Sequence, residues 1–542
     1  MSQEFIERPR KNEKEGAIAY VRELLKQAQA DRRDEDAGKL EDILHLLNTK
    51  KYGLVWEEHA ELVEEEMKTK IPVFVEDESK KIMGNPDSED YNFLLEGDNL
   101  HSLHLLKKTH AGAIDVIYID PPYNTGNKDF IYNDKIVDKT DGYSHSKWLS
   151  FMSKRLEIAR ELLSEVGVIF ISIDDNEQAQ LKLLCDEIFG EENVEINIWS
   201  LIDKSESTFE KTAGYTTRKE HEYLITIRKN TTTKFKKYKD IIDFSSSSFS
   251  NPDNDPRGDW FSGNISRTGI KTTTGSKYYT IITPTGVEYS RNWTLSKEEF
   301  ENAMKENRIY FPKNGGGVPR YKIFATDTKE TIQSSIFSGV KTSITGKNQL
   351  KEVLGFLPFN YPKPIELIKR ILEITSDSDS FVLDFFAGSG TTGHAVAQLN
   401  KEDGGNRKYI LCTNNENNIC EEVTYKRLAN IQEELPHNLK YFKTDFVDKT
   451  EFSGLALEDE LLNYVTPLVE LQFAVDITNP RVQVILSEEQ LDSLTEDDFV
   501  PHSTLFLHPD VFLNESHSQW IRKNQIKIQE IPDYFFGREL WQ

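Results

Sequence analysis

Four residues that follow an apolar segment have side chains suited to holding a nitrogen-bearing ring. Ile114–Ile119 has the composition of a buried strand, and Asp120, Pro121, Pro122 and Tyr123 come directly after it. One interpretation is a plain turn, because Asp and Pro both favour turns after strands. The other is a pocket for a planar ring that carries an amino group. The carboxylate of Asp120 and the carbonyl of Pro121 would accept the hydrogens of the amino group, and the ring of Tyr123 would stack on the planar ring.

This pocket has a definite chemistry. Proline has no backbone N–H to donate, and its fixed φ holds its carbonyl in place. Two acceptors around an exocyclic amine draw the nitrogen lone pair out of conjugation with the ring. The nitrogen then becomes a nucleophile for an electrophilic methyl group, and the reaction requires neither a metal ion nor a covalent enzyme intermediate.

A second segment, "VLDFFAGSGTTGHAVAQL", has the composition of a cofactor loop. A strand over 381–385 leads into the glycine-rich residues 388–392 and then into a helix. Glycines let the backbone approach a ligand closely, and a helix N-terminus offers unpaired N–H groups. The segment is not a phosphate loop, because no Gly-Lys-Ser/Thr follows, and it is not the full dinucleotide fingerprint. It therefore favours a nucleoside-type cofactor held by its amino acid or ribose end.

Alternating strands and helices position both segments. Residues 91–200 alternate between the two patterns, with helices expected to end at Gly167 and Gly190, and the alternation returns over 356–440. This order predicts βαβ units and a parallel sheet covered on both faces. Residues 230–345 lack the pattern and are rich in Ser, Thr, Gly and Asn, so one α/β domain is predicted to be interrupted by an insert.

The ends of the chain carry less information. The first fifty residues contain two helical patterns, which indicate either a helical hairpin or a solvated extension. The last hundred residues mix strand and helix signals, and they show no recognisable site. The expected domains are 1–50 (helical), 51–229 (first catalytic part), 230–350 (insert), 351–442 (second catalytic part) and 443–542 (acidic).

The charge distribution leaves a nucleic-acid partner open. The net charge of −25 argues against such a partner, but residues 201–350 contain 24 Lys and Arg against 17 Asp and Glu. Residues 451–542 carry an excess of 12 acidic residues. A basic middle in an acidic chain is compatible with one module that contacts phosphates, and equally with no such role.

Composition also bears on location. No segment approaches the roughly 18 apolar residues of a membrane span, and the first residues lack the apolar core of a secretory signal. The three cysteines have neither the spacing of a metal site nor that of a disulfide framework. The expected location is the cytoplasm.

The two chemical segments together resemble the motifs of amino-methylating DNA methyltransferases, and more narrowly those of the modification subunit of Type III restriction–modification systems. The resemblance covers roughly residues 45–440. Within it, Asp at position 120 implies adenine rather than cytosine. The order, with the Asp-Pro-Pro-Tyr segment before the insert and the glycine-rich segment after it, is that of the β class, and it makes the insert the target recognition domain.

The resemblance also implies a fold and site residues. The fold is a Rossmann-like, S-adenosylmethionine-dependent methyltransferase fold with a mostly parallel sheet. Lys363 and Pro364 are implied near the methionine end of the cofactor, although Lys363 could instead neutralise a nearby acid, and Asp98 could be only a helix-start residue. The implied catalytic residues are Asp120, Pro121, Pro122 and Tyr123. The implied cofactor residues are Asp98, Asn99, Lys363, Pro364, Asp384, Phe386, Gly388, Gly390, Thr391 and Thr392, with no metal ligand.

One position departs from the family pattern. After the next strand many methyltransferases place an acid for the cofactor ribose, whereas this chain has Asn414 and Asn415 before Glu416. The ribose contact therefore stays open.

The implied reaction transfers a methyl group from S-adenosylmethionine to the N6 amino group of adenine, flipped out of duplex DNA. The implied partners are duplex DNA, a second copy of the chain and a separate ATP-dependent restriction subunit, with no membrane. The alternatives are a solitary methyltransferase, a non-catalytic DNA-binding specificity subunit and, more distantly, a methyltransferase acting on RNA or on protein glutamine.

Overall fold

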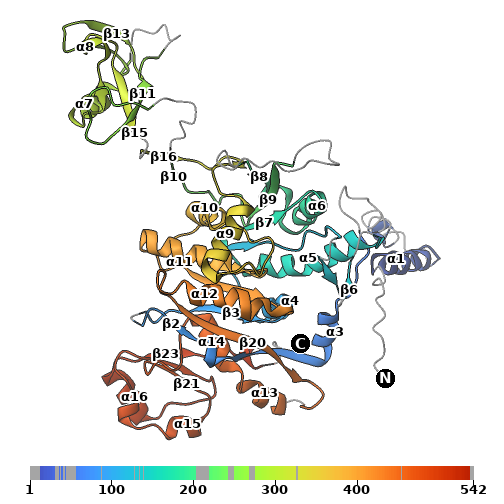
Figure 1. The fold of residues 1–542 in the computed structure, drawn as a ribbon. Coiled ribbons are helices and arrows are strands. Elements are labelled where there is room, and N and C mark those ends of the chain that lie inside the picture. Colours follow the sequence, from blue (N-terminus) through green and yellow to red (C-terminus); the bar gives the residue numbers. More distant parts are fainter. Residues whose placement is uncertain are drawn as a thin grey trace. The chain divides into compact units, whose positions relative to one another are not determined.

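A computed structural model gives the fold, and it consists of two compact units. The first unit is Met1–Phe235 with Ser334–Gln542, and the second is Lys236–Gln333 (Figure 1). The second unit lies inside the 230–350 segment that the sequence sets apart. The structure describes residues 13–30, 36, 38–40, 43, 56–86, 88–126, 129–132, 135–137, 140–202, 219–241, 249–267, 275–324, 327–452 and 455–537.

A large mixed sheet forms the centre of the first unit. Its strand order is β1-β20-β3-β19-β18-β4-β7-β9-β8-β17, with β2 paired to β20. The six strands from β20 to β7 run parallel, while β9 runs antiparallel to both of its neighbours. The strands are β1 (Lys70–Glu76), β2 (Ile82–Met83), β3 (Asn92–Glu96), β4 (Ile114–Ile119), β7 (Leu163–Ile173), β8 (Val194–Ser200), β9 (His221–Arg228), β17 (Ile336–Phe337), β18 (Phe381–Asp384), β19 (Lys408–Thr413) and β20 (Asn438–Asp448).

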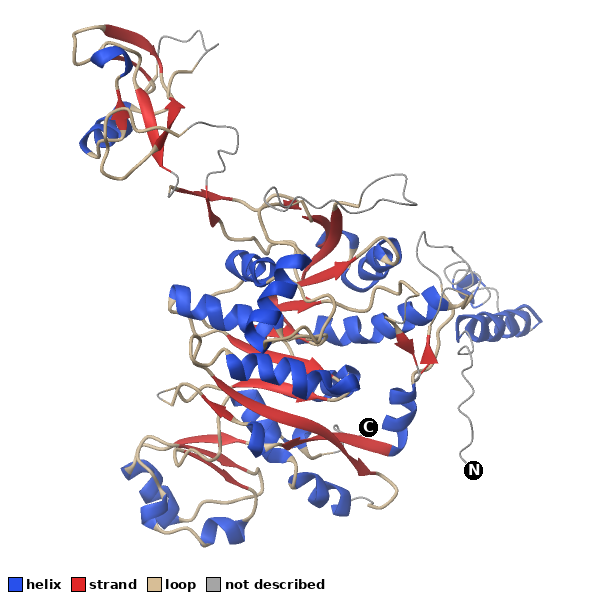
Figure 2. Ribbon diagram, viewed as in Figure 1, coloured by secondary structure: helices blue, strands red, loops and turns tan. Residues whose placement is uncertain are grey.

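Helices cover this sheet in two groups (Figure 2), so the predicted α/β fold with a mostly parallel sheet is confirmed. Helices α4, α5 and α6 pack on one another, as do α10, α11 and α12. A small hairpin of β5 (Ile131–Tyr132) and β6 (Lys135–Ile136) lies outside the sheet. The helical segments are α3 (Leu62–Thr69), α4 (Asn99–Thr109), α5 (Ser144–Leu162), α6 (Gln178–Phe189), α9 (Ser343–Leu354), α10 (Ile365–Thr375), α11 (Thr391–Asp403), η3 (Glu416–Asn418), η4 (Cys420–Tyr425) and α12 (Lys426–Asn430).

The strand register brings the two chemical segments to one edge of the sheet. β18 pairs with β4 in parallel, with Val382 opposite Val116 and Leu383 opposite Ile117. Parallel neighbours end at the same edge, so the turn after Ile119 and the loop after Asp384 start side by side.

One of the two expected helix ends is wrong. The helix expected to reach Gly167 ends at Leu162, because β7 already begins at Leu163. A Cβ on Gly167 would lie 2.9 Å from the backbone oxygen of Ile114, so this glycine permits a close approach between strands instead of capping a helix. The other expectation is confirmed, since α6 ends at Phe189 and Gly190 has a φ of 90°.

The second unit has its own small core. Trp293 is fully buried among Ile265, Ile281 and Phe300. Gly315–Gly317 lie between the paired strands β14 and β15 and so belong to a hairpin connection. The elements are β10 (Tyr238–Ile241), β11 (Trp260–Asn264), β12 (Tyr278–Ile282), β13 (Glu288–Asn292), α7 (Lys297–Lys305), β14 (Ile309–Tyr310), α8 (Pro312–Gly315), β15 (Arg320–Phe324) and β16 (Thr328–Thr331).

The ends of the chain add further elements. Helix α1 (Glu13–Ala30) lies where the first N-terminal helix was expected, and the second, over 39–50, falls almost entirely outside the described residues. The C-terminal region contains a three-stranded parallel sheet with a separate apolar core. Its elements are α13 (Leu455–Leu462), α14 (Val465–Phe473), β21 (Val482–Ile485), α15 (Glu488–Asp492), β22 (Thr504–Leu507), α16 (Glu515–Lys523) and β23 (Lys527–Glu530).

The structure also shows the lengths of the apolar helices and the state of the cysteines. In the part of the chain that the structure describes, no helix has the length and apolar character needed to cross a membrane. Cys185, Cys412 and Cys420 are all free and buried.

Candidate active site

The carboxylate of Asp120, at the end of β4, is held by a lysine from a distant segment. The ammonium nitrogen of Lys363 lies 2.7 Å from Oδ1 and 2.8 Å from Oδ2 of Asp120. The lysine side chain is only 7% exposed. Burial lowers the pKa of Lys363, but the carboxylates of Asp120 and Glu222 outweigh that effect, so the net pKa is raised and the ammonium stays protonated.

The ring of Tyr123 belongs to the same cluster. Its hydroxyl donates to Oε2 of Glu222 at 3.1 Å and accepts from Nζ of Lys363 at 2.8 Å. Burial, followed by the nearby carboxylates of Asp120 and Glu222, raises the pKa of Tyr123 well above its usual value. The tyrosine is therefore a neutral donor, and its ring position is fixed by two charged partners.

The two prolines have different carbonyl environments. Nε1 of Trp148, on α5, donates to the carbonyl of Pro122 at 2.7 Å. No donor among the described residues reaches the carbonyl of Pro121. Of the two carbonyls, only that of Pro121 is available to an incoming amino group.

The exit of the turn is fixed by a buried carboxylate. Asn124 adopts a left-handed conformation with a φ of 56°. Its side-chain amide donates to Oε1 of Glu177 at 2.6 Å and to the hydroxyl of Ser144 at 2.9 Å. Burial raises the pKa of Glu177, although the bonds from Asn124 and His145 act in the opposite direction. These bonds tie the turn to the starts of α5 and α6.

The loop after β18 relies on backbone geometry. Gly388 and Gly390 have φ values of 49° and 73°, which glycine adopts without strain. A Cβ on Gly390 would lie 3.1 Å from the Cγ2 of Thr424, and the hydroxyl of Thr424 donates to the carbonyl of Gly388 at 2.6 Å. The segment η4 thus supports the loop from behind.

Asp384 anchors the start of this loop. Its carboxylate accepts from the backbone N–H of Phe386 at 3.0 Å and from the hydroxyl of Thr392 at 2.5 Å. Burial raises the pKa of Asp384 to about 7, with a smaller contribution from Asp120. The side chain therefore holds the loop against α11 while its charge remains incompletely compensated.

The segment containing Lys363 joins the two halves of the site. Its ammonium group contacts Asp120, and its backbone carbonyl accepts from the hydroxyl of Thr391 at 3.3 Å. Pro364 follows as the N-cap of α10. Of the two readings of Lys363, the structure places it against an acid, and that acid is the proposed catalytic one.

Asp98 and Asn99 begin α4, next to the loop. Asp98 caps the helix by accepting from the N–H of Leu100 at 2.7 Å, so it is a helix-start residue. Its side chain is still 37% exposed, which leaves carboxylate surface for a ligand. The amide of Asn99 donates to the carbonyl of Phe385 at 2.7 Å and ties this turn to the end of β18.

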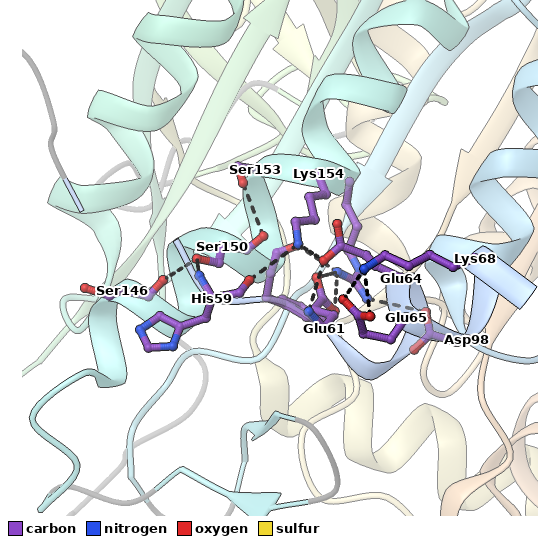
Figure 3. Close-up of polar contacts among 12 residues, drawn as sticks. His59, Glu61, Glu64, Glu65, Lys68, Asp98, Ser146, Ser150, Ser153 and Lys154 are labelled. Carbon is purple, nitrogen blue, oxygen red and sulfur yellow. Dashed lines mark hydrogen bonds and ion pairs between the residues drawn. The ribbon is translucent and has the colours of Figure 1, made fainter. Parts of the chain in front are cut away.

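The N-terminal segment around α3 holds a buried arginine against this turn. Nε of Arg155 donates to Asn99 at 2.6 Å, and its guanidinium pairs with Glu61 at 2.9 Å. Lys154 pairs with Glu64, and the backbone of His59 donates to a serine of α5 (Figure 3). Residues before the first motif thus contribute to the position of Asn99.

Several residues of the site have no signal in the sequence. Glu222 lies on β9, and Trp148 and Arg155 lie on α5, and the spacing of these residues is that of ordinary packing. Arg427, in α12, donates to the hydroxyl of Thr391 in the glycine-rich segment at 2.8 Å. The expected ribose region stays open, because Asn414 and Glu416 are both exposed at the end of β19. Within the described residues, no group of three or more His, Cys, Asp and Glu could hold a metal ion.

Comparisons with known proteins give one matching family model and several relatives. A family model described as DNA methylase, covering N6 and N4 methylation, matches residues 114–425. The Type III restriction-modification enzyme StyLTI Mod subunit of Salmonella typhimurium is 35% identical over 375 residues, covering 64% of this chain and 57% of the relative. The EcoPI Mod subunit of Escherichia phage P1 is 32% identical over 392 residues, covering 60% of this chain and 58% of the relative.

A shorter relative is covered more fully. The Type II methyltransferase M.KpnI of Klebsiella pneumoniae is 32% identical over 376 residues, covering 65% of this chain and 88% of the relative. The chain spans less than two thirds of the length of the two Mod subunits.

Proposed function

Because the chain belongs to the DNA methylase family, we propose that it transfers a methyl group from S-adenosylmethionine to the N6 amino group of adenine in duplex DNA. One observation carries the proposal most strongly. The turn of Asp120 and the loop of Gly388 follow adjacent parallel strands, so an amine acceptor and a nucleoside-type loop share one edge of the sheet.

The residues at this edge fit the cofactor. Gly388 and Gly390, whose backbone is in the left-handed conformation, and the N-terminus of α11 suit the amino acid end of the cofactor. The part-exposed carboxylate of Asp98 suits a hydroxyl or amine donor. S-adenosylmethionine, when bound, supplies an electrophilic methyl group. The residues proposed to hold it are Asp98, Asn99, Lys363, Pro364, Asp384, Phe386, Gly388, Gly390, Thr391 and Thr392.

The residues after β4 hold and activate the base. An oxygen of Asp120 and the carbonyl of Pro121 accept the two amino hydrogens, and the ring of Tyr123 stacks on the base face. Both oxygens of Asp120 are already bonded to Lys363, so base entry shifts the ammonium from at least one of them. The freed carboxylate oxygen then accepts the proton that the methylated amine loses. The base must first leave the duplex, at a cost of a few kcal/mol in stacking and pairing.

The experiment is nucleoside analysis of duplex DNA treated with the purified chain and S-adenosylmethionine. N6-methyldeoxyadenosine is the expected product, and Asp120→Asn serves as the matched inactive control. Methylation only at cytosine N4 would refute the assignment of the base, and methylation that survives equally in the Asp120→Asn variant would refute the assignment of the site.

The unit Lys236–Gln333 is proposed to recognise the DNA sequence. It has its own core and contains 15 Lys and Arg against 12 Asp and Glu, whereas the whole chain is strongly acidic. Basic groups would contact phosphates and polar side chains would contact base edges. Exchanging residues 236–333 for the insert of a relative is expected to change the methylated sequence, and an unchanged sequence would assign recognition to another part of the chain.

Two biological roles follow from two kinds of relative. The Mod subunits among the relatives support a role as the modification subunit of a Type III restriction–modification enzyme. The proposed assembly, a homodimer with a separate ATP-dependent restriction subunit, rests on the resemblance of the motifs alone. M.KpnI, of which the chain covers 88%, favours a methyltransferase without such a subunit. Co-purification of an ATP-dependent nuclease with the tagged chain would support the first role, and its absence alongside full methylation would support the second. A location in the cytoplasm, where cellular DNA is accessible, is part of the same proposal.

A further inference from the structure

A buried arginine lies beneath the glycine-rich loop. Arg427, in α12, is fully buried, and its Nη1 donates to the hydroxyl of Thr391 at 2.8 Å and to the carbonyl of Ser389 at 3.2 Å. Its Nε donates to Nδ1 of His394 at 3.2 Å. The guanidinium therefore contacts both the loop and the first turns of α11.

Among the described residues, none neutralises the charge of Arg427. Its Nη2 has no hydrogen-bond partner among the described residues, and within them no carboxylate pairs with the guanidinium. His394 cannot compensate, because burial and then Arg427 lower its pKa to about 3 and keep it neutral. Burial lowers the pKa of Arg427 to about 9, so the guanidinium still carries its charge at neutral pH. An unpaired buried charge is costly to retain without a compensating partner.

The end of α11 nearest to Arg427 adds positive potential. Gly390 occupies the cap position of this 13-residue helix and offers no side-chain acceptor to its first N–H groups. Unpaired N–H groups and the helix dipole both favour an anion at this end. The uncapped end and the unpaired guanidinium are independent observations, and both indicate a negatively charged ligand.

We propose that Arg427 is a positioning residue that supplies the counter-charge for the carboxylate at the amino acid end of the methyl donor, acting through Thr391 and the first turn of α11. The inference rests on the proposed function, because it takes the glycine-rich loop as the cofactor loop. It adds that the affinity for the cofactor has two parts. One part depends on the charge of the amino acid end, and the other comes from the adenosine.

Two probes separate these parts. S-adenosylhomocysteine and 5′-methylthioadenosine share the adenosine and the thioether, but only the first carries the amino acid end. In calorimetric titration of the full chain, Arg427→Met is expected to weaken S-adenosylhomocysteine about tenfold and 5′-methylthioadenosine less than about twofold. Arg427→Lys, which keeps the positive charge, is expected to restore most of the lost affinity.

Control variants distinguish this role from a purely structural one. Arg407 is also buried and pairs with Asp403 at the other end of α11, so Arg407→Met is expected to change neither affinity. If Arg427→Met does not fold, Thr391→Val removes the hydroxyl that links the arginine to the helix, and the same selective loss is expected.

Three results would overturn the inference. Equal weakening of both probes would make Arg427 a structural residue only, and unchanged binding of S-adenosylhomocysteine by the folded variant would remove its role entirely. A wild-type chain that binds neither probe would contradict the proposed function as well, a result distinct from the other two.

Discussion

The turn after β4 and the loop after β18 start side by side, yet they manage charge in opposite ways. At the turn, Asp120 and Lys363 are paired, and Glu222 lies 3.8 Å from the same ammonium group. At the loop, burial raises the pKa of Asp384 to about 7 and lowers that of Arg427 to about 9, and among the described residues neither has an oppositely charged partner. Within the part of the chain that the structure describes, Lys363 supplies the counter-charge of Asp120, whereas no charged side chain does so for Asp384 or Arg427.

The difference matches the two ligands proposed for the site. An adenine base is uncharged and needs acceptors and a ring to stack on, so the charges around it can be balanced in advance. A methyl donor with an amino acid end is charged. The loop that binds it can therefore contain unpaired charges, which the charged groups of the ligand neutralise. Lys363 contacts both regions, through its ammonium at Asp120 and its carbonyl at Thr391.

The largest expected effect comes from the paired region. Asp120→Asn removes the charged acceptor and keeps the shape of the side chain, so methyl transfer is expected to fall by at least about 100-fold, as for loss of a group that accepts a proton. Binding of S-adenosylhomocysteine is expected to stay within about threefold of wild type, because the charges at the loop are untouched. Titration calorimetry and a radiolabel transfer assay measure the two quantities, and a parallel loss of both would mean that the regions are not separate.

An intermediate effect is expected at the residue that joins the regions. Lys363→Met leaves Asp120 without its counter-charge, and turnover is expected to fall roughly 10- to 100-fold, the range for a lost charge-assisted hydrogen bond. Affinity for S-adenosylhomocysteine is expected to fall less than turnover, because only the backbone carbonyl of Lys363, which the substitution keeps, contacts the cofactor loop at Thr391. If the affinity falls as much as turnover, Lys363 belongs functionally to the cofactor loop, and the contact with Asp120 is secondary.

The smallest effect concerns the pH dependence of stability at the loop. The pKa of Asp384 is about 7 in the folded chain against an ordinary 3.8, so the folded state holds this proton more tightly than the unfolded state. Its contribution to stability is therefore full at low pH, declines as pH rises between these two values, and levels off above about 7. Asp384→Asn lacks this decline.

Thermal unfolding from about pH 5 to about pH 8 measures the effect. The melting temperature of Asp384→Asn minus that of wild type is expected to rise by a few degrees across this range. A constant difference would mean that Asp384 is already paired in the folded chain, which would remove one half of the comparison.

The sequence predicts the fold and the edge of the sheet, because both follow from local patterns. The apolar strand Ile114–Ile119 and the glycines at 388 and 390 can each be recognised from neighbouring residues in the sequence. Adjacent parallel strands end at one edge of the sheet, however many residues separate them in the sequence. The side chains that contact the site residues could not be predicted from these local patterns. Lys363 reaches Asp120 across 243 positions, and Glu222 and Arg427 look like ordinary strand and helix residues, so only the folded chain reveals their contacts.

The end of α5 was mispredicted for a related reason. A glycine after an amphipathic run usually marks a helix end, but Gly167 faces the backbone of Ile114 inside the sheet. Glycine is favoured both where two strands pack closely and where a helix ends. A single sequence does not distinguish these two uses of glycine.

We propose that the site at the turn after β4 directs methylation of adenine N6 at a defined DNA sequence. Single-molecule methylation sequencing of a host that expresses the chain, beside a host that expresses Asp120→Asn, tests it most directly. The predicted result is N6-methyladenine at one recurrent sequence with the wild-type chain and at none with the variant. N4-methylcytosine at the recurrent sequence, or the same adenine methylation in both hosts, would contradict it.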